Sequence, residues 1–140
     1  MRKLQANDFE LGFLDGWRDD SQVVLIGPER PVFTPNVQVH RETLPDLPLA
    51  EFLQAQRLEL ASLAGFKLLG HGERRLGGEP ANFHAYEWEL PNQPGERIHQ
   101  LQVVAIRNNT LFTITLSALV RDWDGFEPAF EMTLAGFAWR

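Results

Sequence analysis

The order of hydrophobic and polar positions predicts strands at the start of the chain and a helix after them. Residues Asn36–Glu42 alternate strictly, with two valines and an arginine on one side and polar side chains on the other, which is typical of a half-buried strand. In Leu49–Leu63 the apolar residues instead recur at helical spacings of three and four and predict one apolar stripe. Gly65 is well placed to end that helix, because glycine readily adopts the left-handed backbone of a C-terminal cap.

Turn residues divide the rest of the chain into further strands and a closing helix. Strands are expected at residues 8–14, 22–26, 66–74, 81–90, 97–107 and 110–118. The pairs Gly77-Gly78 and Asn108-Asn109 suit two-residue hairpin turns, since glycine and asparagine tolerate positive φ. In Trp123–Gly136 aromatic and leucine residues recur every four positions and predict a second helix. Because short connections force antiparallel neighbours, we predict one α+β domain over residues 1–140 with a meandering antiparallel sheet.

The Asn108-Asn109 turn sets which residues of its two strands face each other, and therefore which face of the sheet forms the core. Counting outward from the turn places three apolar pairs on one face. These pairs are Ala105/Phe112, Val103/Ile114 and Leu101/Leu116. We expect both main helices to pack on this one face. Their contributing residues should be Phe52, Leu60, Phe130 and Leu134.

The opposite face of the predicted sheet carries amides, hydroxyls, imidazoles and aromatic rings but no fixed charge. Its candidate client-binding residues are Gln38, His40, His84, Tyr86, Trp88, Gln100, Gln102, Val104, Thr113, Thr115 and Ser117. A solvent-facing sheet surface usually carries lysine, arginine and glutamate, so this composition favours a face that a partner covers and dehydrates. Two other interpretations remain open. The face could be a dimer interface, or it could hold ordinary strand residues, because threonine, tyrosine and tryptophan favour strands anyway.

Composition and charge exclude several classes of function. The 140-residue chain has no cysteine, which removes disulfides, cysteine metal sites and a thiol nucleophile. Its net charge of -6 argues against a nucleic-acid partner, which would favour a basic face. The first residues lack the apolar core of a signal peptide, and no apolar run approaches the ~20 residues that span a membrane. We therefore expect a cytoplasmic protein without stable membrane insertion.

No cluster of residues indicates catalysis or a bound cofactor. The histidines His40, His71, His84 and His99 lack the spacing of a helical zinc site, and no serine sits in a nucleophile-elbow sequence. The glycine pairs match neither phosphate-binding fingerprint, and turns explain them. We expect no enzyme, no cofactor and no metal. A catalytic or small-ligand site near His40 and His84 is the enzymatic alternative.

Six short segments, met in order along nearly the whole chain, carry a resemblance to a known family. They are Leu14–Ser21, Phe33–Glu42, Ala64–Leu69, Gly77–Ala81, Tyr86 with Trp88, and Phe130–Phe137. With Asp15 in place of a proline and Gly136 in place of a serine, they resemble the DcrB-related family. Within that family they are similar to the Eag proteins, which are chaperone-adaptors for type VI secretion effectors.

The resemblance implies both a fold and a function. The fold would be PsbP-like. The function would be to hold the hydrophobic N-terminal transmembrane segments of a secreted effector in the bacterial cytoplasm before export, with a homodimer as a possible state. A non-catalytic interaction or assembly subunit that uses the same sheet face for dimerisation or docking is the alternative from another class. A concave, uncharged sheet face favours the chaperone, whereas a dry two-fold interface over that face favours the assembly subunit.

Overall fold

The computed structural model of the chain describes residues 2–6 and 8–140, and its elements confirm the α+β class. Ten strands and helices follow one another along these residues. They are β1 (Arg2–Gln5), β2 (Glu10–Phe13), β3 (Val23–Ile26), β4 (Asn36–Thr43), α1 (Leu49–Leu60), β5 (Lys67–Leu76), β6 (Glu79–Glu89), β7 (Arg97–Arg107), β8 (Thr110–Leu119) and α2 (Val120–Ala135). Strand β1 was not expected from the sequence. It pairs with β2, and an ion pair joins Lys3 Nζ to Glu10 Oε1 at 3.0 Å.

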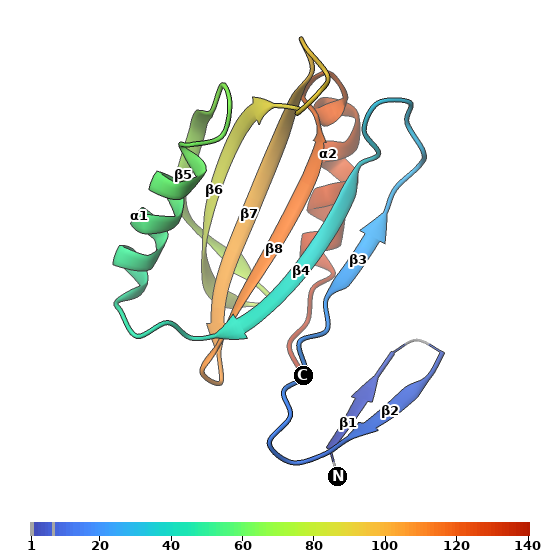
Figure 1. Cartoon of the computed structure of the whole chain (residues 1–140), viewed down its shortest axis with the longest axis vertical. Coiled ribbons are helices and arrows are strands. Elements are labelled where there is room, and N and C mark those ends of the chain that lie inside the picture. The colour runs from blue at the N-terminus through green and yellow to red at the C-terminus, as the bar shows by residue number, and fades with distance from the viewer. Residues whose placement is uncertain (1, 7) are drawn as a thin grey trace.

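One six-stranded antiparallel sheet forms the body of the molecule, and the β1-β2 hairpin stands apart from it (Figure 1). The strand order is β3-β4-β8-β7-β6-β5, so β5 to β8 form a continuous meander. Strand β4 joins this meander beside β8, with Asn36 opposite Ser117 and Thr43 opposite Thr110. The predicted meandering antiparallel sheet is therefore confirmed, and β3 and β5 are its two edges.

The turn between β7 and β8 has the predicted length and conformation. Asn108 and Asn109 adopt φ values of 52° and 59°, as a two-residue primed hairpin requires. Arg107 faces Thr110, and the register runs on without a shift to the pair of Ile98 with Leu119. All three predicted core pairs therefore lie opposite one another, and the assignment of the two faces is correct.

Helix α2 and the C-terminal segment cover the predicted core face. Val103 and Leu116 are completely buried there, with 0% of their surface exposed. Phe130 and Leu134 of α2 pack against this cluster as predicted, and the C-terminal residue Trp139 packs on its margin. Phe112 departs from the prediction of full burial. Its ring lies at the end of the face in edge contact with Trp139, at 5.1 Å between centroids, and is only half-buried.

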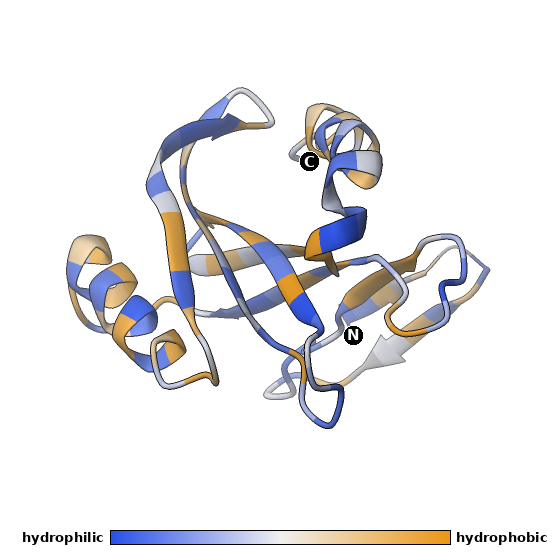
Figure 2. Ribbon diagram, turned by 90° about the horizontal axis from the view of Figure 1, so that it is seen from above, coloured by the Kyte–Doolittle hydropathy of each residue, from blue (hydrophilic) through white to orange (hydrophobic). Residues whose placement is uncertain are grey.

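Helix α1 packs on the other face of the sheet, so the prediction that both helices share one face is wrong. Phe52 and Leu53 of α1 contact Val104 and Leu111, whereas Val103, the neighbour of Val104, points into the α2 core. Successive residues of a strand point to opposite faces, so the two helices lie on opposite sides of the curved sheet (Figure 2). Leu60 belongs to neither buried cluster.

The physical reason for the correction lies at the hairpin end of the sheet, where β7 ends and β8 begins. The outer face is apolar there because it presents Val104 and Leu111, which are 1% and 0% exposed. Strand β4 ends beside this region, where Thr43 pairs with Thr110, so the chain enters α1 close to these side chains. The apolar stripe of a helix does not specify which face of the sheet it covers. The path of the chain from β4 into α1 determines that face.

Candidate functional site

The register of the sheet brings the predicted client-binding residues onto one surface, here called the polar face. It comprises Gln38, His40, His84, Tyr86, Trp88, Gln100, Gln102, Val104, Thr113, Thr115 and Ser117. One straight row crosses four strands as Gln38, Thr115, Gln102 and His84. The sequence placed these residues together by alternation, and the pairing of β4 with β8 completes the surface.

Side-chain hydrogen bonds lock the middle of the polar face. Trp88 Nε1 donates to Gln100 Oε1 at 2.9 Å, and Gln100 Nε2 donates to Ser117 Oγ at 2.9 Å. His84 Nε2 and Gln102 Oε1 are 2.6 Å apart, and because an amide oxygen only accepts, the imidazole donates. The Gln102 amide nitrogen then keeps two donors that no described protein group uses. These donors are held in a fixed position for an incoming acceptor.

The polar face is divided into a covered half and an open half. His84, Tyr86 and Val104 are each 1% exposed, so they support the surface from below and cannot touch a partner in this conformation. Ser117 and Thr113 are also buried. This corrects the sequence prediction, which treated all eleven residues as accessible. The physical reason is that α1 and the residues after it, including Phe66 against Tyr86, cover the β5-β6 side of the face.

The open half, here called the open strip, lies between α1 and the edge strand β3. Its members from the prediction are Gln38, Gln100, Gln102 and Thr115, which are half-buried or exposed. The other two predicted residues, His40 and Trp88, are half-buried as well. Strand β3 adds Val24 opposite Gln38 and Ile26 opposite Asn36, at 52% and 74% exposure. Apolar side chains and free hydrogen-bonding groups therefore stand side by side on an uncharged surface.

Two contributors were missed by the sequence argument. Val24 was missed because the four-residue run of β3 is apolar on both sides and gives no alternation to follow. Gln56 was missed although it follows Phe52 by four positions on the sheet-facing stripe of α1, which was the available signal. The Gln56 Oε1 atom is buried with no hydrogen-bond donor among the described residues.

Burial favours the neutral forms of His84 and Tyr86 on the polar face. Desolvation lowers the pKa of His84 below 6.5, and the hydrogen bond to Gln102 only partly opposes this. Desolvation also raises the pKa of the Tyr86 hydroxyl. On the core face, burial lowers the pKa of His99, which stacks on Trp123 with ring centroids 3.7 Å apart. The environment of His84 and Tyr86 therefore favours the uncharged state of the part of the polar face that they support.

Acid is expected to destabilise the fold through these imidazoles. A base whose pKa is lowered in the folded state binds fewer protons there than when unfolded, so stability is complete above pH 6.5 and falls as pH drops toward the lowered value. The melting temperature should therefore fall between about pH 7.5 and pH 5.5. His84→Gln should reduce this slope without removing it, because the pKa of His99 is lowered too.

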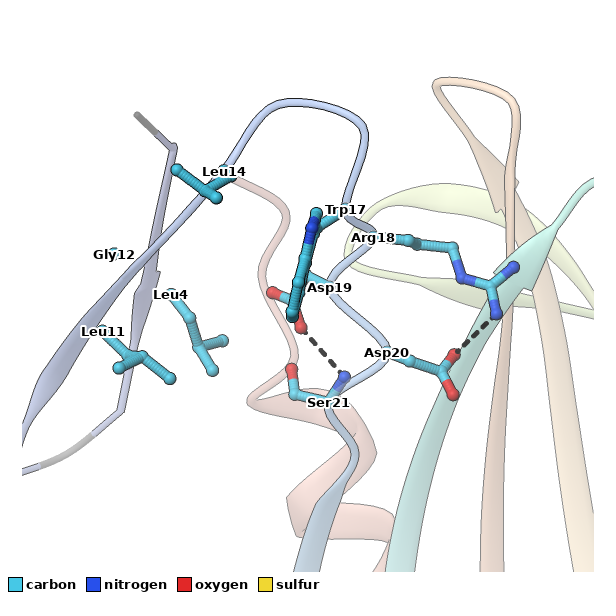
Figure 3. A pocket seen from close by; sticks show the side chains of 9 residues that line it. All are labelled: Leu4, Leu11, Gly12, Leu14, Trp17, Arg18, Asp19, Asp20 and Ser21. Atoms are coloured by element: carbon cyan, nitrogen blue, oxygen red, sulfur yellow. Dashed lines mark hydrogen bonds and ion pairs between the residues drawn. The ribbon is translucent and has the colours of Figure 1, made fainter.

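A hollow of about 480 Å³ lies between the β1-β2 hairpin and the segment that follows it, apart from the polar face (Figure 3). Leu4, Leu11, Leu14 and Trp17 form its apolar lining, and the backbone then turns through the charged residues 18–20. Trp17 is 68% exposed. The hollow contains the segment Leu14–Ser21 that carries part of the family resemblance, so this segment shapes the junction between the hairpin and β3 rather than the polar face.

The described residues contain neither a cluster of metal ligands nor a helix that could span a membrane. Within residues 2–6 and 8–140, no three His, Asp or Glu side chains gather where they could hold a metal ion. Over the same residues, neither helix has the length and apolar character needed to cross a membrane.

Comparison with known families decides the relationship of the chain. The sequence model of the DcrB family matches residues 8–135. This protein belongs to the DcrB family. The match includes every element from β2 to α2, and thus both halves of the polar face. No curated protein matches the chain at a significant level.

Solved structures confirm the PsbP-like fold of this DcrB family member. A protein of unknown function from Pseudomonas aeruginosa, PA94, is 25% identical with a TM-score of 0.81, and the match covers 100% of this chain and 97% of that one. LpqN of Mycobacterium tuberculosis, involved in cell envelope biogenesis, is 19% identical with a TM-score of 0.59, covering 88% and 86%. Cyanobacterial PsbP from Synechocystis is 16% identical with a TM-score of 0.53, covering 97% and 89%.

Proposed function

We propose that this DcrB family member is a cytoplasmic chaperone-adaptor of the Eag type, which holds hydrophobic transmembrane segments of a type VI secretion effector before export. Holding is stoichiometric, so the protein supplies a surface and needs no nucleotide, metal or catalytic group. The observation that carries the proposal is the open strip, which is uncharged, presents free hydrogen-bond donors and adjoins an apolar edge strand. Membership of the DcrB family supports it at the level of the family.

The chemistry of the open strip matches what a transmembrane helix needs in water. Covering its apolar surface is worth about 25 cal/mol per Å². Val24 and Ile26 offer apolar surface for this purpose. Small residues on such helices let a neighbouring surface approach closely and leave polar backbone atoms within reach. The amide of Gln102 and the hydroxyl of Thr115 can meet those atoms without the cost of dehydrating a charge.

The dimensions of the open strip also fit one helix. Adjacent strands lie about 4.8 Å apart, so β4, β8 and β7 together span about 10 Å. An α-helix with its side chains is about 10–12 Å across. The first turns of α1 form a wall on one side, where Leu53 packs on Val104, and β3 forms the other side. A client helix laid along these strands would contact the floor and both walls at once.

Co-expression with a defined apolar segment tests the proposal. A tagged segment of about 20 apolar residues, rich in Ala, Gly and Ser, should co-purify with the protein and remain soluble. The matched control is the same segment with two central lysines, which should not be retained. Retention of both segments would show non-specific adhesion, and retention of neither would contradict the chaperone function.

One observation favours the alternative function as an assembly subunit. Strand β3 is a sheet edge, and its residues Val23 to Ile26 are each more than half exposed. Exposed apolar edges pair readily with another strand. If β3 serves assembly alone, the protein should form an oligomer that Val24→Lys dissociates, and the apolar segment should not be retained. If the chaperone proposal holds, Val24→Lys should weaken retention of the segment.

A further inference from the structure

A second cavity lies on the core side of the sheet and is not part of the polar face. It measures about 580 Å³, and its lining includes the C-terminal segment and the start of β3. These two segments run side by side (Figure 1). Val23 and Val39 line the cavity, and they lie on the same face of the sheet as the core residue Ile114. The cavity and the open strip are therefore on opposite faces. A ligand in one site leaves the other site free.

Basic residues gather around this cavity although the protein as a whole is acidic. Lys3, Arg41, Arg107 and Arg140 line it, against the single acidic residue Asp19. The net charge of the chain is -6, so this concentration of positive charge runs against the average of the surface. Such a local excess favours an anion.

Two of these four basic side chains have no carboxylate side chain as a partner. Arg41 Nη2 pairs with Asp19 Oδ2 at 3.1 Å, and Lys3 pairs with Glu10. Arg107 and Arg140 have no carboxylate partner among the described side chains. Arg107 is held in place by an aromatic ring instead, with Cζ 5.0 Å from the centroid of Trp139. A guanidinium fixed over a ring keeps its N–H donors available for a carboxylate.

The apolar part of the cavity selects an aliphatic chain rather than an aromatic ring. Trp139 is already occupied: Arg107 lies over its ring, and Phe112 and Phe137 meet it edge-on at 5.1 and 4.8 Å between centroids. Its indole N–H also donates to the Leu76 carbonyl oxygen at 3.0 Å, which fixes the ring. A stacked base would therefore compete with the guanidinium and the two phenylalanine rings for Trp139. The remaining apolar walls are aliphatic, from Leu4, Val23 and Val39.

We infer that this cavity, with Arg107 at its rim, binds a single-chain aliphatic carboxylate. The carboxylate is bound by Arg107, with Thr110 and Asn108 as further hydrogen-bonding groups beside it. The hydrocarbon chain lies against the two valines and the aromatic floor. The volume falls within the range of about 300–1,000 Å³ that small-molecule sites occupy. The inference does not rest on the proposed chaperone function.

Binding of decanoate to the full chain tests the inference. The four tryptophans give four indole N–H signals in a nitrogen–proton correlation spectrum, and Trp139→Phe identifies the signal of Trp139. Decanoate should shift that signal saturably. Decanol lacks the charge, butyrate lacks the chain and decyltrimethylammonium carries the opposite charge. Each of them should bind at least about tenfold more weakly. Decanol and decyltrimethylammonium lose the charge-assisted contact, and butyrate loses most of the apolar burial.

Two variants locate the site. Arg107→Gln should weaken decanoate binding about tenfold, whereas Arg121→Gln, which alters an exposed arginine on α2, should not change it. Val23→Asp adds a repelling charge to the wall at a position that is 54% exposed, so it should abolish binding while the melting temperature is kept. The inference is overturned if decanoate leaves the Trp139 signal unmoved, if decyltrimethylammonium moves it equally, or if both cavity variants bind as wild type.

Discussion

Gln102→Glu is expected to weaken retention of an apolar client segment by at least about tenfold. Gln102 lies at the centre of the open strip, and its amide donors are the groups that no described protein atom uses. The substitution replaces these donors with a carboxylate that the client must cover. Dehydrating an unpaired carboxylate costs several kcal/mol, and about 1.4 kcal/mol already corresponds to a tenfold loss of affinity. Retention of the tagged segment by the purified variant measures the effect.

The hydrogen bond between Gln102 and His84 determines the pH at which this experiment should be done. A new carboxylate 2.6 Å from the imidazole would raise the pKa of His84 and become neutralised by it in mild acid. The comparison therefore belongs at about pH 8, where the imidazole is neutral. Gln93→Glu is the matched control, because it makes the same chemical change in an exposed loop. Equal retention by both variants, with normal melting, would place the client site elsewhere.

Leu116→Ala is expected to destabilise the fold by about 3 kcal/mol. Leu116 is 0% exposed at the middle of the α2 side of the sheet, and Leu101 and Val37 face it from the neighbouring strands. Truncation there leaves a cavity that rigid strands on both sides cannot close. Chemical denaturation with urea, fitted to a two-state transition, gives the change in free energy of unfolding.

Two comparisons make the result on Leu116 specific. Leu58→Ala, at a helical position that is 69% exposed, should change the free energy of unfolding by no more than about 0.5 kcal/mol. Leu116→Ala should also leave the affinity of the remaining folded protein for a client segment unchanged, because its side chain points away from the open strip. A loss under about 1 kcal/mol for Leu116→Ala would mean that the core is misplaced.

The faces of the sheet could be predicted because their causes are local. The alternation within each strand and the length of the Asn108-Asn109 turn together fixed the register of β7 and β8, and Ala105 does face Phe112. The side chains that share a face follow from the period of two alone. The uncharged composition of the polar face was therefore available from the sequence before any strand was placed beside another.

Accessibility of the polar face could not be predicted in the same way. Gln102 and His84 face each other on the adjacent strands β7 and β6, yet Gln102 lies in the open strip while His84 is 1% exposed. The difference is made by α1, whose position depends on long-range packing rather than on its own pattern. Half of the predicted site residues are therefore supports, and the contacts of a client are limited to those that α1 leaves uncovered.

The sequence by itself determined the elements from β2 to α2, the antiparallel meander, the α2 core and the chemical character of the two sheet faces, because periodicity and turn residues act over a few positions. Only the tertiary structure decided that α1 covers the face opposite α2. It alone brought Arg107 over Trp139 beside the edge strand β3, from segments far apart in the chain. These arrangements depend on packing between segments that are far apart in the chain, and no local pattern of residues specifies such packing.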